Sequence, residues 1–128
     1  MKVLIDTHAL LWLLADDPRL SDTARRTFLE IDNRVYFSIA SLWELTVKVS
    51  IGKLRLAREW LPEIQDEMNA NTIRWLAIAP EHCAVLATLP FHHRDPFDRM
   101  LVSQAVVEDM ALLSRDPQLR AYPVPCVW

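Results

Sequence analysis

Four acidic residues lie near predicted junctions between a strand unit and the following helix: Asp6, Glu44, Asp98 and Asp116. In a parallel α/β sheet such junctions share the carboxyl edge, where ligands bind. Two carboxylates about 4 Å apart repel by roughly 4 kcal/mol at an effective dielectric constant near 20, so a cluster must take up protons or hold a cation. Oxygen ligands favour Mg²⁺ or Mn²⁺. Such an ion suits phosphodiester hydrolysis, because it activates water and neutralises phosphate charge.

These acids also have a structural interpretation. Asp6 and Asp116 have positions typical of helix N-caps, and Asp98 would favour a helix N-terminus. Ser41 and Glu44 have the spacing of a capping box, which predicts that a helix begins at Ser41. Capping accounts for acids near such junctions, but it does not require them to meet at one edge. Spacing alone leaves both interpretations open.

The elements that would position the acids alternate between strands and helices. Apolar and β-branched runs predict strands at 2–5, 35–38, 73–78 and 111–113, with a last edge strand at 124–127. Helical spacing and capping residues predict helices at about 7–15, 21–31, 41–51, 59–70, 80–89 and 95–109. Asp95 has the N-cap signature, with Pro96 at the first helical position. This alternation predicts an α/β fold with a mainly parallel sheet of four to five strands between helical layers, in one domain spanning 1–128.

Composition narrows the class of protein. The chain is 52% hydrophobic and 24% charged, with a net charge of −3, so it should be globular and should not hold nucleic acid by bulk positive charge. No apolar run has the length of a membrane span and no signal peptide is evident, so we expect a cytoplasmic protein. Cys83 and Cys126 lack metal-site spacing. Gly52 is the single glycine, which excludes a glycine-rich phosphate loop.

Several longer motifs resemble one family. They are Leu4-Ile5-Asp6-Thr7-His8-Ala9-Leu10-Leu11-Trp12, Ser38-Ile39-Ala40-Ser41-Leu42-Trp43-Glu44, Gly52-Lys53-Leu54, His92-His93-Arg94-Asp95-Pro96-Phe97-Asp98-Arg99-Met100-Leu101 and Ser114-Arg115-Asp116. Together they resemble the PIN-domain nucleases, in particular the VapC-type toxins of type II toxin–antitoxin pairs. The resemblance extends over nearly the whole chain, and the Asp95-Pro96-Phe97-Asp98-Arg99 run is its most specific part.

The resemblance implies a three-layer, PIN-like α/β/α sandwich and a Mg²⁺-dependent ribonuclease, with Mn²⁺ as an alternative ion. The family's acidic pocket corresponds to Asp6, Glu44, Asp98 and Asp116. It implies Asp6 and Asp98 as direct metal ligands. Glu44 and Asp116 would bind metal through water, complete a second site or orient the attacking water. Ser114, and Thr7 beside Asp6, would support the acids by hydrogen bonding, while Asp95 would mainly cap its helix.

The resemblance also implies partners. A homodimer and a cognate antitoxin are expected, with the antitoxin laid across the helices and blocking the pocket. Candidate groove residues are Leu11, Trp12, Trp43, Val47 and Trp60, for which ordinary core packing is the alternative. Candidate RNA-binding residues, which would contact phosphate without choosing sequence, are Lys48, Lys53, Arg55, Arg58, Arg94 and Arg99.

The histidines receive a different interpretation. His92 and His93 lack a third histidine or cysteine at ligand spacing, so they are predicted to be loop residues that touch RNA or solvent. His8 is predicted to support the site or the fold, and His82 to lie on the surface.

Other functions are less compatible with the sequence. An aspartyl-phosphate phosphatase needs a second acid two residues after the first, where this chain has His8. A receiver domain needs a late lysine, and no lysine follows Lys53. The remaining alternative is a catalytically silent PIN-like module that binds a protein or RNA without cleavage.

Overall fold

A computed structural model describes all 128 residues. It contains one five-stranded sheet in the order β3-β2-β1-β4-β5, in which every neighbouring pair is parallel. The strands are β1 (Lys2–Ile5), β2 (Arg34–Ser38), β3 (Arg74–Leu76), β4 (Ala111–Leu113) and β5 (Cys126–Val127). The helices are α1 (Thr7–Leu14), α2 (Asp22–Leu29), α3 (Ile39–Ser50), α4 (Trp60–Ala70), α5 (Pro80–Leu86), α6 (Pro96–Glu108) and the 3-10 helix η1 (Pro117–Ala121). The predicted α/β/α sandwich with a central parallel sheet is therefore confirmed.

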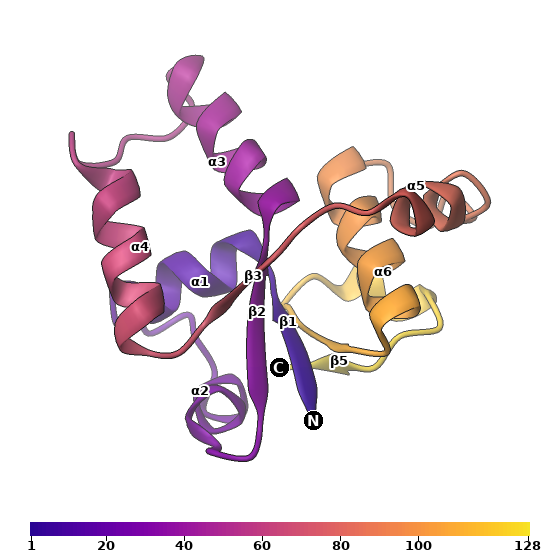
Figure 1. The fold of residues 1–128 in the computed structure, drawn as a ribbon, viewed down its shortest axis with the longest axis horizontal. Helices are drawn as coiled ribbons and strands as arrows, with labels where there is room; N and C mark the ends of the chain where they lie inside the picture. Colours follow the sequence, from indigo (N-terminus) through magenta and orange to yellow (C-terminus); the bar gives the residue numbers. More distant parts are fainter.

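The two faces of the sheet bury separate apolar clusters, because side chains alternate along a strand. Val3 and Ile5 of β1 face a cluster that α1, α2 and α4 complete. Leu4 faces the other cluster, which is built mainly by α6 and η1. Figure 1 shows these helices on opposite sides of the strands. Neither face is open to water, which explains why β1 and β4 are continuous apolar runs without polar alternation.

The central strands end at the same level. Ile5 pairs with Phe37 on one side and with Leu113 on the other. The residues that follow these three positions therefore emerge side by side at the carboxyl edge. Helix α3 rises from this edge and contacts both α1 and α6.

The N-cap of helix α3 lies three residues earlier than predicted. This residue is Ser38, whose hydroxyl accepts a hydrogen bond from Ala40 N at 3.0 Å. Ser41 therefore lies inside the helix, where its buried hydroxyl has no partner. The predicted capping box between Ser41 and Glu44 is wrong, because the serine nearest the strand end takes the cap. Gly52 follows the C-cap with φ +76, as expected for the C′ position.

A buried polar contact joins the sheet to α6. The Ser38 hydroxyl donates to Gln104 Oε1 at 2.6 Å, and Gln104 Nε2 donates to the Ala77 carbonyl at 3.3 Å. Both side chains are fully buried. Since unpaired buried polar groups are costly, this contact fixes the helix that carries Asp98.

We expect Ser38→Ala to lower the free energy of unfolding by about 2–3 kcal/mol, because it removes a cap and leaves the buried Oε1 of Gln104 without a partner. Ser21→Ala is the matched control, since Ser21 caps α2 through Ala24 N and makes no other side-chain hydrogen bond. The control should lose about 1 kcal/mol. Urea unfolding of both variants measures the difference, and equal losses would contradict the role given to Gln104.

Candidate active site

Asp6 follows β1 directly and is the N-cap of α1. Its Oδ1 accepts a hydrogen bond from Ala9 N at 2.7 Å, and the residue is 8% exposed. Burial raises the pKa of Asp6, while the Ser114 side chain and the Ala9 N–H oppose that shift. Asp6 is therefore both a helix cap and a carboxylate at the sheet edge, so the two interpretations of this residue are compatible.

Glu44 lies in the second turn of α3 and is almost fully buried. Its Oε1 accepts a hydrogen bond from the Thr7 hydroxyl at 2.6 Å, and its Oε2 forms an ion pair with Lys48 Nζ at 2.8 Å. Thr7 thus supports Glu44 and not Asp6, because its side chain turns toward α3. Since Ser38 caps α3, the Glu44 carboxylate is not used in capping and is held instead by Thr7 and Lys48.

Asp98 occupies the first turn of α6. The neighbouring Asp95 accepts the N–H groups of Phe97 and Asp98 at 2.8 and 3.2 Å, so Asp95 is the cap and the Asp98 side chain is not needed for capping. Burial raises the pKa of Asp98 to about 7, and the charges of Asp95, Glu44 and Asp6 add to that shift. Asp98 is thus poised to change charge near neutral pH.

Asp116 starts η1, three residues after β4. Its Oδ1 accepts a hydrogen bond from Gln118 N at 2.9 Å, and its own N–H donates to the Ser114 hydroxyl at 3.1 Å. Its Oδ2 lies 2.7 Å from His93 Nε2. The cap uses one carboxylate oxygen, which leaves the other directed toward the pocket.

His93 bridges two of the acids. Its Nε2 is 2.7 Å from Asp116 Oδ2 and 3.2 Å from Asp98 Oδ2, and the residue is 9% exposed. Its Nδ1 accepts a hydrogen bond from Asp95 N at 3.0 Å, so in the neutral ring the proton must be on Nε2. His93 therefore donates toward the acids. It lies in the loop before α6, as predicted, but the expectation that it touches RNA or solvent is wrong, because the ring is buried against Asp98 and Asp116.

Sequence reasoning missed His93 because it looked for ligand spacing among histidines and cysteines. The usable signal was its place two residues before an N-cap at the sheet edge. From there its ring can bind the backbone of the cap and still reach the pocket. His92 has no such role and packs against the Tyr122 ring at 5.1 Å between centroids.

The structure brings the four predicted acids to one edge. We call Asp6, Glu44, Asp98 and Asp116 the acidic cluster. The charge of Glu44 contributes to the raised pKa of Asp6, and the charges of both acids contribute to the raised pKa of Asp98. His93 links Asp98 to Asp116, with the ligand atoms of these three residues within 4.8 Å of one another.

The cluster fits a divalent cation. It contains four carboxylates, and only Lys48 and His93 form ion pairs with them. Burial and mutual repulsion already raise the pKa values of Asp6 and Asp98. A cation would remove this repulsion, and a donor set rich in carboxylate oxygen suits Mg²⁺ or Mn²⁺.

The basic residues are not equally available. Lys53 and Arg94 are exposed, while Lys48 is held by Glu44. Arg99 is 5% exposed, and its guanidinium donates to the carbonyls of three residues before α6: Leu86, Leu89 and Pro90. The predicted RNA contact of Arg99 is therefore wrong. Its guanidinium binds these carbonyls in the segment before α6 and does not face the acidic cluster.

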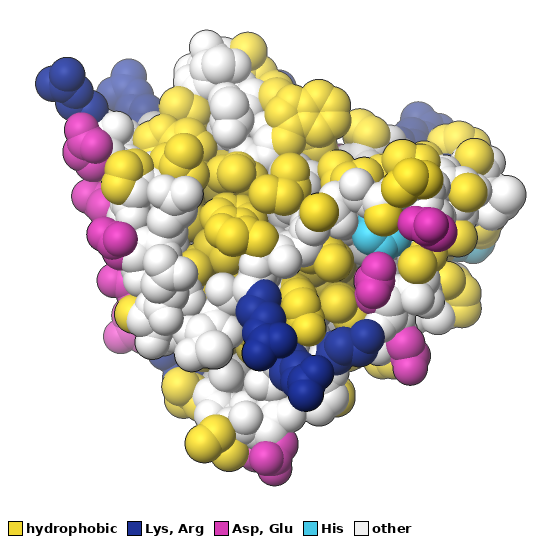
Figure 2. Space-filling view, in the orientation of Figure 1, with side chains coloured by type: hydrophobic (Ala, Val, Ile, Leu, Met, Phe, Trp, Pro, Cys, Tyr) yellow, Lys and Arg dark blue, Asp and Glu magenta, His cyan; other side chains and the backbone are white.

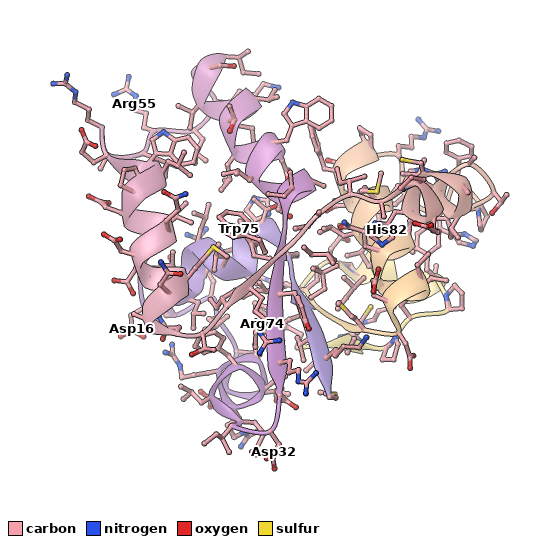
Figure 3. The ribbon with its side chains drawn as sticks, viewed as in Figure 1. Asp16, Asp32, Arg55, Arg74, Trp75 and His82 are labelled. Atoms are coloured by element: carbon pink, nitrogen blue, oxygen red, sulfur yellow. The ribbon has the colours of Figure 1, made fainter.

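His82 is also buried, contrary to the prediction of a surface residue. Its Nδ1 accepts a hydrogen bond from Ala79 N at 2.9 Å, and its Nε2 lies 2.9 Å from Glu108 Oε1. Figure 3 places it between α5 and α6. It joins these two helices away from the acidic cluster.

Comparison with known proteins agrees with this architecture. Ribonuclease VapC22 of Mycobacterium tuberculosis is 28% identical over 127 residues, which cover 96% of this chain and 93% of that protein. The structure of VapBC-1 from nontypeable Haemophilus influenzae has a TM-score of 0.72 at 15% identity, covering 98% of this chain and 96% of that one. VapBC2 from Rickettsia felis, bound to a DNA fragment from its promoter, has a TM-score of 0.71 at 14% identity, covering 98% and 97%. The PIN domain family model matches residues 3–125, and the chain therefore belongs to the PIN domain family.

Proposed function

We propose that the protein is a metal-dependent endoribonuclease that hydrolyses RNA phosphodiester bonds as the toxin of a toxin–antitoxin pair. The observation that carries this proposal is the acidic cluster, in which a PIN-family fold buries carboxylates at the carboxyl edge and raises the pKa of two of them. The name of the relative Ribonuclease VapC22 supports the same activity. As a toxin that cuts cellular RNA, the protein would act in the cytoplasm. None of the helices combines the length and apolar character needed to span a bilayer.

We assign each side chain of the site a separate role in this reaction. Asp6 and Asp98 would hold Mg²⁺ or Mn²⁺ directly, with Asp116 as a further ligand. The bound ion would lower the pKa of a water molecule and neutralise phosphate charge. Glu44, fixed by Thr7 and Lys48, would orient the attacking water. His93 holds Asp98 and Asp116 in position through its Nε2 proton.

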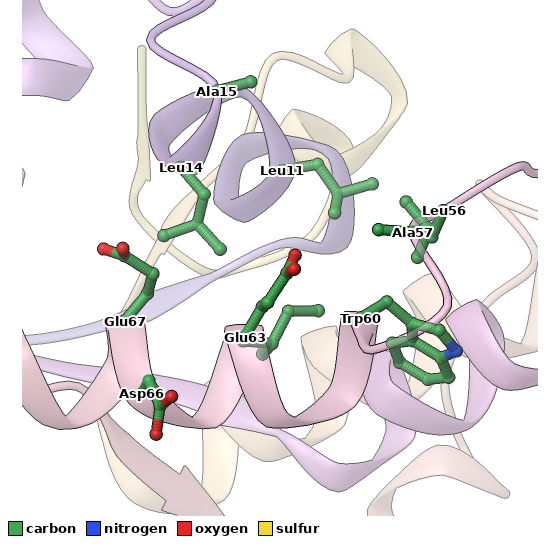
Figure 4. Close-up of a pocket in the computed structure, with 10 residues that line it drawn as sticks. Leu11, Leu14, Ala15, Leu56, Ala57, Trp60, Glu63, Asp66 and Glu67 are labelled. Carbon is green, nitrogen blue, oxygen red and sulfur yellow. The ribbon is translucent and has the colours of Figure 1, made fainter.

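A groove between α1 and α4 supports an antitoxin partner. Leu11, Leu14, Leu56 and Trp60 line a recess of about 440 Å³, and Glu63, Asp66 and Glu67 add acidic side chains to its wall. Figure 4 shows this groove, and Figure 2 shows acidic side chains along the outer edge of α4. An antitoxin segment that carries apolar and basic side chains would complement it. Of the five predicted groove residues, Leu11 and Trp60 line this groove.

An exposed apolar surface supports the homodimer. Trp43 of α3 is 60% exposed and contacts Phe97 edge to face, with 5.3 Å between ring centroids. Ile39, Trp75 and Ile78 are also exposed. Figure 2 shows apolar side chains gathered over α3 and the segment between β3 and α5. Covering this surface with a second copy would bury Trp43, which directly precedes Glu44 of the acidic cluster.

We expect Asp6→Asn and Asp98→Asn each to reduce RNA cleavage at least about 100-fold, because each removes a charge that holds the metal. EDTA should abolish cleavage by the unaltered protein, and added Mg²⁺ or Mn²⁺ should restore it. Cleavage of total bacterial RNA by antitoxin-free protein is the measurement. Asp32→Asn, at the opposite end of the molecule in Figure 3, is the matched control and should cut normally.

Cleavage that survives both substitutions would place the activity outside the acidic cluster. Mg²⁺ binding without cleavage of any RNA would favour the silent interaction module. These two results separate a wrong site from a wrong function.

We expect the metal-free protein to lose stability as the pH rises. The pKa of Asp98 is 3.8 in an ordinary setting and about 7 in the folded chain. Between these values the folded state binds more protons than the unfolded state, so the free energy of unfolding falls with rising pH and levels off above about pH 7. Asp98→Asn removes this contribution, on the order of 2–4 kcal/mol.

Urea unfolding in EDTA from acid to neutral pH measures the difference between the two proteins. The variant should be the more stable one at neutral pH, and the advantage should shrink as the pH falls toward that of an ordinary aspartate. Curves that stay parallel across this range would contradict the raised pKa.

A further inference from the structure

A second recess opens beside the acidic cluster, next to α1. It has a volume of about 290 Å³ and is lined by Asp6, His8, Trp12, Arg115, Asp116 and Pro117. We call it the Trp12 pocket. It shares Asp6 and Asp116 with the acidic cluster, so a molecule in it would lie directly beside any metal that the cluster holds.

Trp12 is a fixed aromatic wall of this pocket. The ring is half-buried and packs against Trp128 with 5.7 Å between centroids. The exposed His8 ring lies 5.9 Å away at a tilt, and the Arg19 guanidinium carbon is 4.9 Å from the Trp12 centroid. Neighbours on several sides therefore hold the indole in one orientation, as a stacking surface requires.

Arg115 supplies free positive charge at the same place. It is exposed, lies 5.8 Å from the Trp12 ring and forms no ion pair, although Asp116 follows it in the chain. Arg19, by contrast, is engaged in an ion pair with Asp17 at 2.8 Å. The pocket thus combines an aromatic face, an unpaired guanidinium and two carboxylates of the candidate active site.

We propose that the Trp12 pocket binds the base and phosphate of one unpaired nucleotide next to the scissile phosphate; this inference rests on the proposed nuclease function. The base packs on Trp12, since aromatic side chains stack any base that is free of its own stack. Arg115 contacts the adjoining phosphate. The volume, near the lower limit of small-molecule sites, admits one nucleotide and not several. A base that is paired and stacked in a duplex has no free face for Trp12, so this subsite selects an unpaired nucleotide.

Binding, measured apart from cleavage, tests this subsite. The probe is a short unstructured RNA with a fluorescent label, titrated in Mg²⁺ against protein carrying Asp98→Asn so that it stays intact. In this background Trp12→Leu keeps apolar volume without an aromatic face, whereas Trp12→Phe keeps the face. Arg115→Ala removes the free charge. Arg120→Ala, an exposed arginine of η1 outside the pocket, is its matched control.

We expect Trp12→Leu and Arg115→Ala each to weaken binding about 5- to 30-fold, and Trp12→Phe and Arg120→Ala to stay within about 2-fold. The same RNA in a duplex should bind more weakly than the single strand. Unfolding curves identify any variant that has lost its structure, and if Trp12→Leu is one of them, the comparison of Arg115→Ala with Arg120→Ala decides. Unchanged binding in Arg115→Ala and folded Trp12→Leu, or a duplex bound as tightly as the single strand, would overturn the subsite.

The test separates the subsite from the proposed function. If the unaltered protein cuts no RNA but Trp12→Leu still weakens single-strand binding, the nuclease proposal fails while the nucleotide site stands. If the protein cuts RNA and binding is insensitive to Trp12 and Arg115, the subsite fails and the nuclease proposal stands.

Discussion

Burial of the acidic cluster, together with the repulsion among its four carboxylates, is the constraint on which the structure of this site depends. Four acids converge at one edge of the sheet, and two of them have raised pKa values. The surrounding structure compensates for part of this repulsion. Asp6 and Asp98 lie at helix N-termini, whose dipoles favour negative charge. Lys48 forms an ion pair with Glu44, and His93 donates toward Asp98 and Asp116. A divalent cation would neutralise the negative charge that remains in the acidic cluster.

Capping by other residues leaves the acids available. Ser38 caps α3, so Glu44 can accept from Thr7 and Lys48. Asp95 caps α6, so Asp98 can reach His93. Each helix thus begins with a residue that satisfies the backbone and places an acid three or six positions later at the pocket. Because a different residue caps each of these two helices, Glu44 and Asp98 are not needed for capping.

Helix α1 connects the proposed surfaces. Asp6 caps it at the acidic cluster, Leu11 faces the groove shared with α4, and Trp12 faces the pocket beside Asp116. These three positions lie within two helical turns. An antitoxin seated on the groove would therefore contact the same rigid helix that carries the proposed nucleotide subsite. The groove proposed for the antitoxin and the proposed nucleotide subsite therefore lie next to each other on α1.

The sequence by itself determined the order of strands and helices, the parallel sheet and the edge at which the acids meet. These follow from local patterns: apolar runs such as 2–5, the cap at Asp95 with Pro96, and the alternation of elements along the chain. The tertiary structure decided what each polar side chain contacts. Ser38 displaced Ser41 as a cap, Arg99 turned inward to carbonyls, and His93 reached Asp98 and Asp116. Some of these partners are near in sequence and others, such as His93 and Asp116, are far apart. Which partner each polar group takes depends on how the helices pack across the sheet, and no local pattern encodes that packing.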